Sequence, residues 1–157
     1  MRLVLAGVLA AVAAATALAA GGPKAPPLSG VDPVTGKRVS LAAYAGRPVV
    51  INVWASWCHG CQEEASDLHS FVHSHPKLAV IGIDSMDTKA GARTFYRVYD
   101  LEYPSIFDPK GTIGAKLKVI GIPTTFFLDR EHRIVVTVAG SATLAHFNAA
   151  LRMTLHG

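Results

Sequence analysis

Two β-rich apolar runs, separated by a polar segment without helix breakers, constrain the fold of this chain more than any other feature. The runs are "PVVINVWA" (48–55) and "LAVIGID" (78–84), and their length and composition are typical of buried strands. The segment between them, from Cys61 to about Ser74, places apolar residues on one helical face. The sequence therefore predicts a strand, a helix and a second buried strand in succession.

The rest of the chain continues this alternation. In chain order we expect a helix, a short strand end with a turn, two strands around a turn, and a final helix, over residues 88–99, 106–111, 124–129, 133–140 and 142–155. Alternating strands and helices followed by a hairpin and a helix indicate an α/β fold, with a mixed central sheet flanked by helices. The length of 157 residues suits one domain with a substantial core.

The N-terminal segment has the pattern of an export signal. Arg2 precedes an uncharged, alanine-rich run over 3–20, and Ala17-Leu18-Ala19 offers a cleavage site for a signal peptidase. Residues 1–20 are therefore predicted to be a signal peptide or, if they are not cleaved, an N-terminal membrane anchor that tethers the protein through 3–20. Either outcome places the rest of the chain outside the cytoplasm.

Residues 21–36, "GGPKAPPLSGVDPVTG", are rich in Gly and Pro and are expected to form a tether and a turn. The predicted domain then covers 37–157. The whole chain has a formal net charge of +4, but its Lys and Arg residues are scattered along the sequence. This distribution predicts no nucleic-acid binding.

The segment "WASWCHGCQEE" (54–64) contains the only two cysteines, Cys58 and Cys61. A c-type haem site is excluded because Gln62, not a histidine, follows the second cysteine. A structural zinc site would need two more ligands. The candidate ligands are three histidines of the following segment, His69, His73 and His75. An exposed polar helix explains these histidines better, so we predict no metal site.

Two readings of the cysteine pair remain, a structural disulfide and a redox-active one. A disulfide across two intervening residues closes too short a loop to stabilise the fold much, although export would permit it. Cys58 is placed where a buried strand ends and a helix begins, and unpaired N–H groups there favour a thiolate. Cys61 lies one turn further on, where it can resolve a mixed disulfide. The redox reading is therefore preferred.

Three motifs in order resemble those of the exported thioredoxin-fold thiol–disulfide oxidoreductases of bacteria, the TlpA/ResA/DsbE (CcmG-like) group. "GKRVSLAAYAGRPVVINVWASWC" (36–58) resembles the group's entry strand and the approach to its active site. Residues 79–111 resemble its strand–helix insertion, and "VIGIPTTFFLDREHRIV" (119–135) its cis-proline strand and hairpin. The resemblance implies a thioredoxin-like fold with this insertion and a location at the periplasmic or other extracytoplasmic face of the membrane.

The same resemblance implies roles for individual residues. Cys58 attacks a client sulfur or is attacked by one, and Cys61 resolves the intermediate. Pro123 is expected to be cis and to face the disulfide, so that Ile122, Pro123 and Thr124 shape the peptide-binding site. Thr124 stands where cytochrome-maturation members often carry glutamate, which leaves a more general client equally open.

Four further residues are expected to support or tune the site. Trp57 would form part of its wall, and Glu64 matches a glutamate typical of the group. Gly60 replaces the group's usual proline. His59, when protonated, would stabilise the Cys58 thiolate and make the disulfide more oxidising. Since Asn52 stands where thioredoxins carry a buried aspartate, Glu64 or His59 would have to assist Cys61.

These inferences predict an enzyme that exchanges a Cys58–Cys61 disulfide with protein thiols. A reductase is favoured, with cytochrome c maturation as one possible setting and a membrane protein as the electron donor. The alternatives are an oxidant that introduces disulfides and, from another class, a copper-binding chaperone using the two cysteines and a histidine. A peroxidase is disfavoured because Ala55 stands where related peroxidases place threonine. No cofactor is expected.

Overall fold

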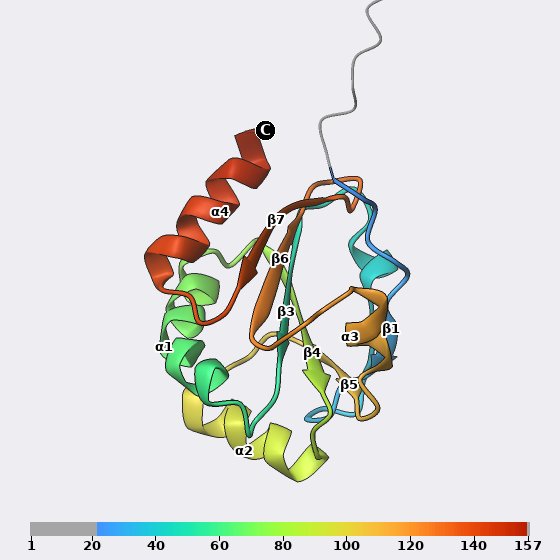
Figure 1. Cartoon of the computed structure of the whole chain (residues 1–157), viewed down its shortest axis with the longest axis vertical. Coiled ribbons are helices and arrows are strands. Elements are labelled where there is room, and N and C mark those ends of the chain that lie inside the picture. Colours follow the sequence, from blue (N-terminus) through green and yellow to red (C-terminus); the bar gives the residue numbers. More distant parts are fainter. Residues whose placement is uncertain (1–21, 157) are drawn as a thin grey trace, which may run out of the picture.

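The computed structural model describes residues 22–156, so the predictions for 1–20 lie outside the described part of the chain. Its helices and strands follow one another along the chain as shown in Figure 1. In order they are β1 (Ser29–Val31), β2 (Arg38–Ser40), the short 3₁₀ helix η1 (Leu41–Tyr44), β3 (Val49–Trp54), α1 (His59–Ser74), β4 (Ala79–Ser85), α2 (Lys89–Tyr99), β5 (Ser105–Asp108), α3 (Thr112–Lys116), β6 (Thr124–Leu128), β7 (Ile134–Ala139) and α4 (Leu144–His156).

The central sheet has five strands in the order β5-β4-β3-β6-β7. β3 pairs in parallel with β4 and antiparallel with β6, β4 pairs in parallel with β5, and β6 pairs antiparallel with β7. The predicted mixed sheet is confirmed. All six residues of β3 are buried, as expected of a central strand covered on both faces.

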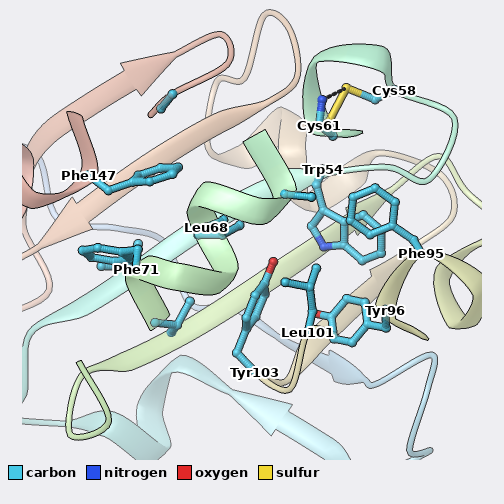
Figure 2. Packing of buried hydrophobic residues seen from close by; sticks show 14 of the residues in the cluster. Trp54, Cys58, Cys61, Leu68, Phe71, Phe95, Tyr96, Leu101, Tyr103 and Phe147 are labelled. Carbon is cyan, nitrogen blue, oxygen red and sulfur yellow. Dashed lines mark hydrogen bonds between the residues drawn. A yellow bond between two sulfur atoms is a disulfide. The ribbon is translucent and has the colours of Figure 1, made fainter. Parts of the chain in front are cut away.

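The alternation of side chains along β3 divides the core into two clusters. Val50 and Trp54 belong to the cluster on the face covered by α1, α2 and α4, which includes Phe71 and Phe147 (Figures 1 and 2). Val49, Ile51 and Val53 of the same strand belong to the second cluster. The elements of that second cluster are α3 and the β1–β2 hairpin, on the other face of the sheet (Figure 1).

β4, α2 and β5 form the strand–helix addition expected over 79–111, and β5 is the edge strand of the sheet. α2 begins after Thr88, whose hydroxyl accepts a hydrogen bond from the Gly91 N–H at 3.0 Å. The short helix α3 was not predicted. Its first N–H groups donate to the carboxylate of Asp108, a local contact that lets five residues form a helix after a turn.

The segment 22–36 differs from the predicted tether. Lys24 forms a β-bridge with Arg133, and the Ala25 N–H donates to the His132 carbonyl at 2.9 Å. Leu28 is buried in the core, and residues 29–31 pair with β2. The predicted domain boundary at 37 is therefore wrong. Gly and Pro are compatible with extended edge segments as well as with tethers, and the few apolar residues between them are the ones that pack.

Within residues 22–156, none of the helices combines the length and the apolar character needed to cross a membrane.

Candidate active site around the Cys58–Cys61 disulfide

The two cysteines form a disulfide at the junction of β3 and α1 (Figure 2). Cys58 is the N-cap of α1, and its sulfur accepts a hydrogen bond from the Cys61 N–H at 3.1 Å. Cys58 is 5% exposed and Cys61 only 2%. The partly positive start of a 16-residue helix lies against Cys58, so its thiolate is favoured after reduction.

The chain just before Cys58 is held by the loop between β4 and α2. The Ser56 N–H and hydroxyl both donate to the Asp87 carboxylate, at 2.6 and 2.9 Å. The Trp57 indole N–H donates to the Met86 carbonyl at 3.0 Å, and the Trp57 side chain remains 57% exposed. These contacts fix an aromatic surface directly beside Cys58.

The second tryptophan of the motif has a different place. Trp54 is buried beneath the site and stacks on Phe95 with ring centroids 4.6 Å apart (Figure 2). Its indole N–H donates to the Ser105 hydroxyl at 3.2 Å. Trp57 therefore presents its ring to solvent beside Cys58, whereas Trp54 belongs to the core.

His59 is solvent-exposed and lies 3.2 Å, Nε2 to Oε1, from the carboxylate of Glu63. The pair is i, i+4 on α1, a spacing that brings side chains together. When His59 is protonated, the neighbouring negative charge offsets much of its field at Cys58. The exposed position and the acidic partner both weaken the tuning effect expected of His59.

Gly60 brings the first turn of α1 close to the loop that contains Pro123. The Ile122–Pro123 peptide bond is cis, and a Cβ placed on Gly60 would lie 3.1 Å from the Pro123 ring. Ile122 is half-buried, and Thr124 donates from its hydroxyl to the Gly121 carbonyl at 2.6 Å. The structure thus places the segment 122–124 beside the disulfide-bearing turn.

Glu64 is a buried carboxyl group on the inner side of α1. Its two oxygens accept hydrogen bonds from the Asn52 amide at 2.9 Å and from the Ala142 N–H at 3.1 Å. Burial raises the pKa of Glu64 to about 7, although these two hydrogen bonds lower it. Glu64 can therefore gain and lose a proton near neutral pH, one helical turn from Cys61.

Asn52 holds Glu64 in place, and its loss should be costly. Its amide also donates to the Thr125 hydroxyl at 2.9 Å. We expect Asn52→Ala to lower the free energy of unfolding by about 2 kcal/mol, because buried acceptors lose their donor. The loss should be larger at pH 9 than at pH 5, since the amide favours ionised Glu64, and the pKa of Glu64 should rise. Urea unfolding at both pH values measures this, and equal losses would contradict the assignment.

A second buried acid, Asp84, lies at the end of β4 in register with Trp54. Asp84 is fully buried, and neither oxygen has a hydrogen-bond partner among the described residues. Burial is the main cause that raises its pKa to about 8, followed by the charges of Asp87, Asp108 and Asp32. Asp84 was not among the site residues predicted from the sequence, although an acidic residue inside an apolar strand is a visible signal.

The histidines considered as metal ligands do not converge on the cysteines. His69 and His73 share a face of α1 with ring centroids 5.7 Å apart, and His69 contacts the Asp100 carbonyl. Across residues 22–156, no three His, Cys, Asp or Glu side chains are grouped so that they could hold a metal ion.

Comparisons with known proteins agree with this geometry. The AhpC/TSA family matches residues 22–137. Thiol-disulfide oxidoreductase ResA of Bacillus thuringiensis is 27% identical over 72% of this chain and 66% of its own length, so the chain spans slightly less than two thirds of that relative. Thioredoxin-like protein YneN of Bacillus subtilis is 32% identical, covering 78% of this chain and 73% of its own. A secreted thiol-disulfide isomerase from Corynebacterium glutamicum has a TM-score of 0.73 and 27% identity, covering 83% and 85% of the two chains.

Proposed function

The chain belongs to the thioredoxin-like AhpC/TSA family, and on that basis we propose that it is a thiol–disulfide oxidoreductase that exchanges its Cys58–Cys61 disulfide with protein thiols. The observation that carries the proposal is the disulfide itself, at the start of a long helix and beside Pro123. The names of the ResA relative and the secreted isomerase support the same activity. Ala55 offers no hydroxyl near Cys58, so peroxide reduction is not proposed.

In the reducing direction the cysteines act in sequence. The Cys58 thiolate attacks one sulfur of a client disulfide, forms a Cys58–client disulfide and releases one client thiolate. Cys61 then loses its proton and attacks the Cys58 sulfur, which releases the second client thiolate and closes the Cys58–Cys61 disulfide. Two electrons pass to the client. Glu64, with its pKa near 7, accepts the proton of Cys61.

The client peptide binds along residues 122–124, beside the first turn of α1, and contacts Trp57 next to Cys58. Pro123 has no backbone N–H, so it cannot donate a hydrogen bond to a neighbouring strand at this point. The exposed Trp57 ring supplies apolar contact area next to the reacting sulfur. Ile122, Pro123 and Thr124 therefore form the proposed substrate-binding segment.

A reductase is the proposed direction, and the surroundings of His59 support it. A protonated histidine alone would favour the thiolate and make the disulfide strongly oxidising, but Glu63 offsets that charge. An exported reductase needs electrons, which a membrane protein would supply. One setting is the reduction of the haem-attachment cysteines of apocytochrome c. The proposal of export is supported by the pattern of residues 1–20 and by the secreted relative. Fractionation of the bacterial host and the intact mass of the protein, which shows whether residues 1–20 have been removed, test it.

The reduction potential of Cys58 and Cys61 tests the proposal. Protein lacking residues 1–20 is equilibrated with glutathione buffers, and the oxidised fraction is measured by mass spectrometry after thiol alkylation. A potential near −270 mV, as for thioredoxin, supports the reductase, whereas about −120 mV, as for DsbA, supports the oxidant. A pair that exchanges with no thiol would overturn the activity itself.

A further inference from the structure

Three consecutive residues after β7 each bond to a different part of the site. The Gly140 N–H donates to the Pro123 carbonyl at 2.9 Å, and the Ala142 N–H donates to Glu64 at 3.1 Å. Between them, the Ser141 hydroxyl lies 3.1 Å from the Gly60 carbonyl in the first turn of α1. The connection between β7 and α4 therefore bonds to Pro123, to the first turn of α1 at Gly60, and to Glu64.

Gly60 makes the Ser141 contact possible. A Cβ at position 60 would lie 2.7 Å from the Ser141 hydroxyl oxygen, closer than real contacts allow, and 3.1 Å from the Pro123 ring. Glycine is normally unfavourable inside a helix relative to alanine. Here it allows the backbone of the turn to approach a hydroxyl from another part of the chain.

The Ser141 hydroxyl also connects the turn to the exposed ion pair. It lies 3.1 Å from Oε2 of Glu63, while Oε1 of Glu63 faces His59. With one hydrogen to donate, the hydroxyl serves either Gly60 or Glu63 at any moment, and both acceptors belong to the start of α1. Each arrangement ties that turn to the β7–α4 connection.

We propose that Ser141 is a positioning residue that stabilises the first turn of α1 more in the reduced protein than in the oxidised one. In the oxidised form the disulfide holds Cys58 and Cys61 together covalently. In the reduced form only non-covalent contacts keep the N–H groups of the turn directed at the Cys58 thiolate. Ser141 therefore shifts the equilibrium toward the dithiol. This inference rests on the proposed thiol–disulfide exchange.

The test compares Ser141→Ala with wild type and with Ser70→Ala in glutathione equilibrium. Ser70 is the matched control, because its hydroxyl also donates to a carbonyl of α1, that of Ser66 at 2.9 Å, away from the cysteines. We expect Ser141→Ala to favour the disulfide by about fivefold in the equilibrium constant, the effect of one hydrogen bond lost mainly in one redox form. The pKa of the Cys58 thiol should rise in the same variant, and Ser70→Ala should change neither.

Thermal unfolding of both redox forms separates positioning from simple support. If Ser141→Ala lowers both melting temperatures equally and leaves the glutathione equilibrium unchanged, Ser141 is structural only and the inference is overturned.

Gly60→Ala should displace the hydroxyl and shift the equilibrium in the same direction as Ser141→Ala. The double variant Gly60→Ala/Ser141→Ala should shift the glutathione equilibrium constant by less than the two single shifts combined, whereas strict additivity would contradict the contact. Wild-type protein that fails to exchange with glutathione would instead refute the proposed function.

Discussion

Replacing Cys61 with serine is expected to trap client proteins on Cys58 and to abolish turnover. Cys58 can still attack a client disulfide, but no second thiolate is then available to break the Cys58–client bond. The mixed disulfide should accumulate to one per protein molecule and disappear on adding dithiothreitol. Non-reducing electrophoresis and intact mass spectrometry measure it, with a model disulfide protein such as insulin as the client.

Cys58→Ser is the matched control for this trapping. Cys61 is the more buried cysteine and lies inside the first turn of the helix, so it should capture almost no client. Trapping by Cys58→Ser, or wild-type turnover by Cys61→Ser, would show that the roles of the two cysteines are reversed or that only one is needed. Both single variants should lose catalysed insulin reduction to the level of the uncatalysed reaction.

Replacing Asp84 with asparagine should stabilise the protein at alkaline pH. The pKa of Asp84 is raised in the folded protein to about 8, from 3.8 for the unperturbed group, so the folded state binds this proton more tightly than the unfolded state. The contribution of Asp84 to the free energy of unfolding should therefore fall as the pH rises from about 4 to about 8. Asparagine is neutral throughout and can donate to Asp87. We expect the variant to be more stable than wild type by about 2 kcal/mol at pH 9, and similar to it at pH 4.

Urea unfolding at pH 4, 6.5 and 9 measures the divergence between the two proteins. Asp67→Asn, at a half-buried carboxylate on α1, controls for the loss of one negative charge. Parallel curves for wild type and Asp84→Asn across this range would show that Asp84 does not hold the proton. A variant that is less stable at every pH would show that the carboxylate is held by favourable contacts.

Sequence patterns predicted the central part of the fold because its signals are local. The apolar runs at 48–55 and 78–84 became β3 and β4, and the polar segment with one apolar face became most of α1. The β1–β2 hairpin and α3 were missed because each is built from three to five residues, too few to show a period. The hairpin depends on a contact with a distant segment, since the Asp32 carboxylate accepts from the Ser105 N–H. α3 depends on its local hydrogen bonds to Asp108.

The candidate site divides in the same way. The spacing and position of Cys58 and Cys61 singled out the two residues that form the disulfide, since a short motif at a strand–helix junction carries its own physical meaning. Ser141 and Gly60 are 81 residues apart, and a lone serine in a loop gives no signal of the contact. Asp87 was not among the residues predicted to support the site, yet it holds the chain before Cys58. Long-range polar contacts of this kind are set by tertiary structure alone.

The β-bridge between Lys24 and Arg133 fixes where the N-terminal end of the described chain lies relative to the disulfide. It lies beside the β6–β7 turn, at the end of the sheet where β3 begins, whereas Cys58 follows the other end of β3 (Figure 1). Six strand residues separate these two ends by about 17 Å. A surface, a bead or a lipid layer attached ahead of residue 22 would therefore hold the protein by the end of the sheet at which β3 begins. The opposite end of the sheet, which bears the disulfide and Trp57, would then face the solution.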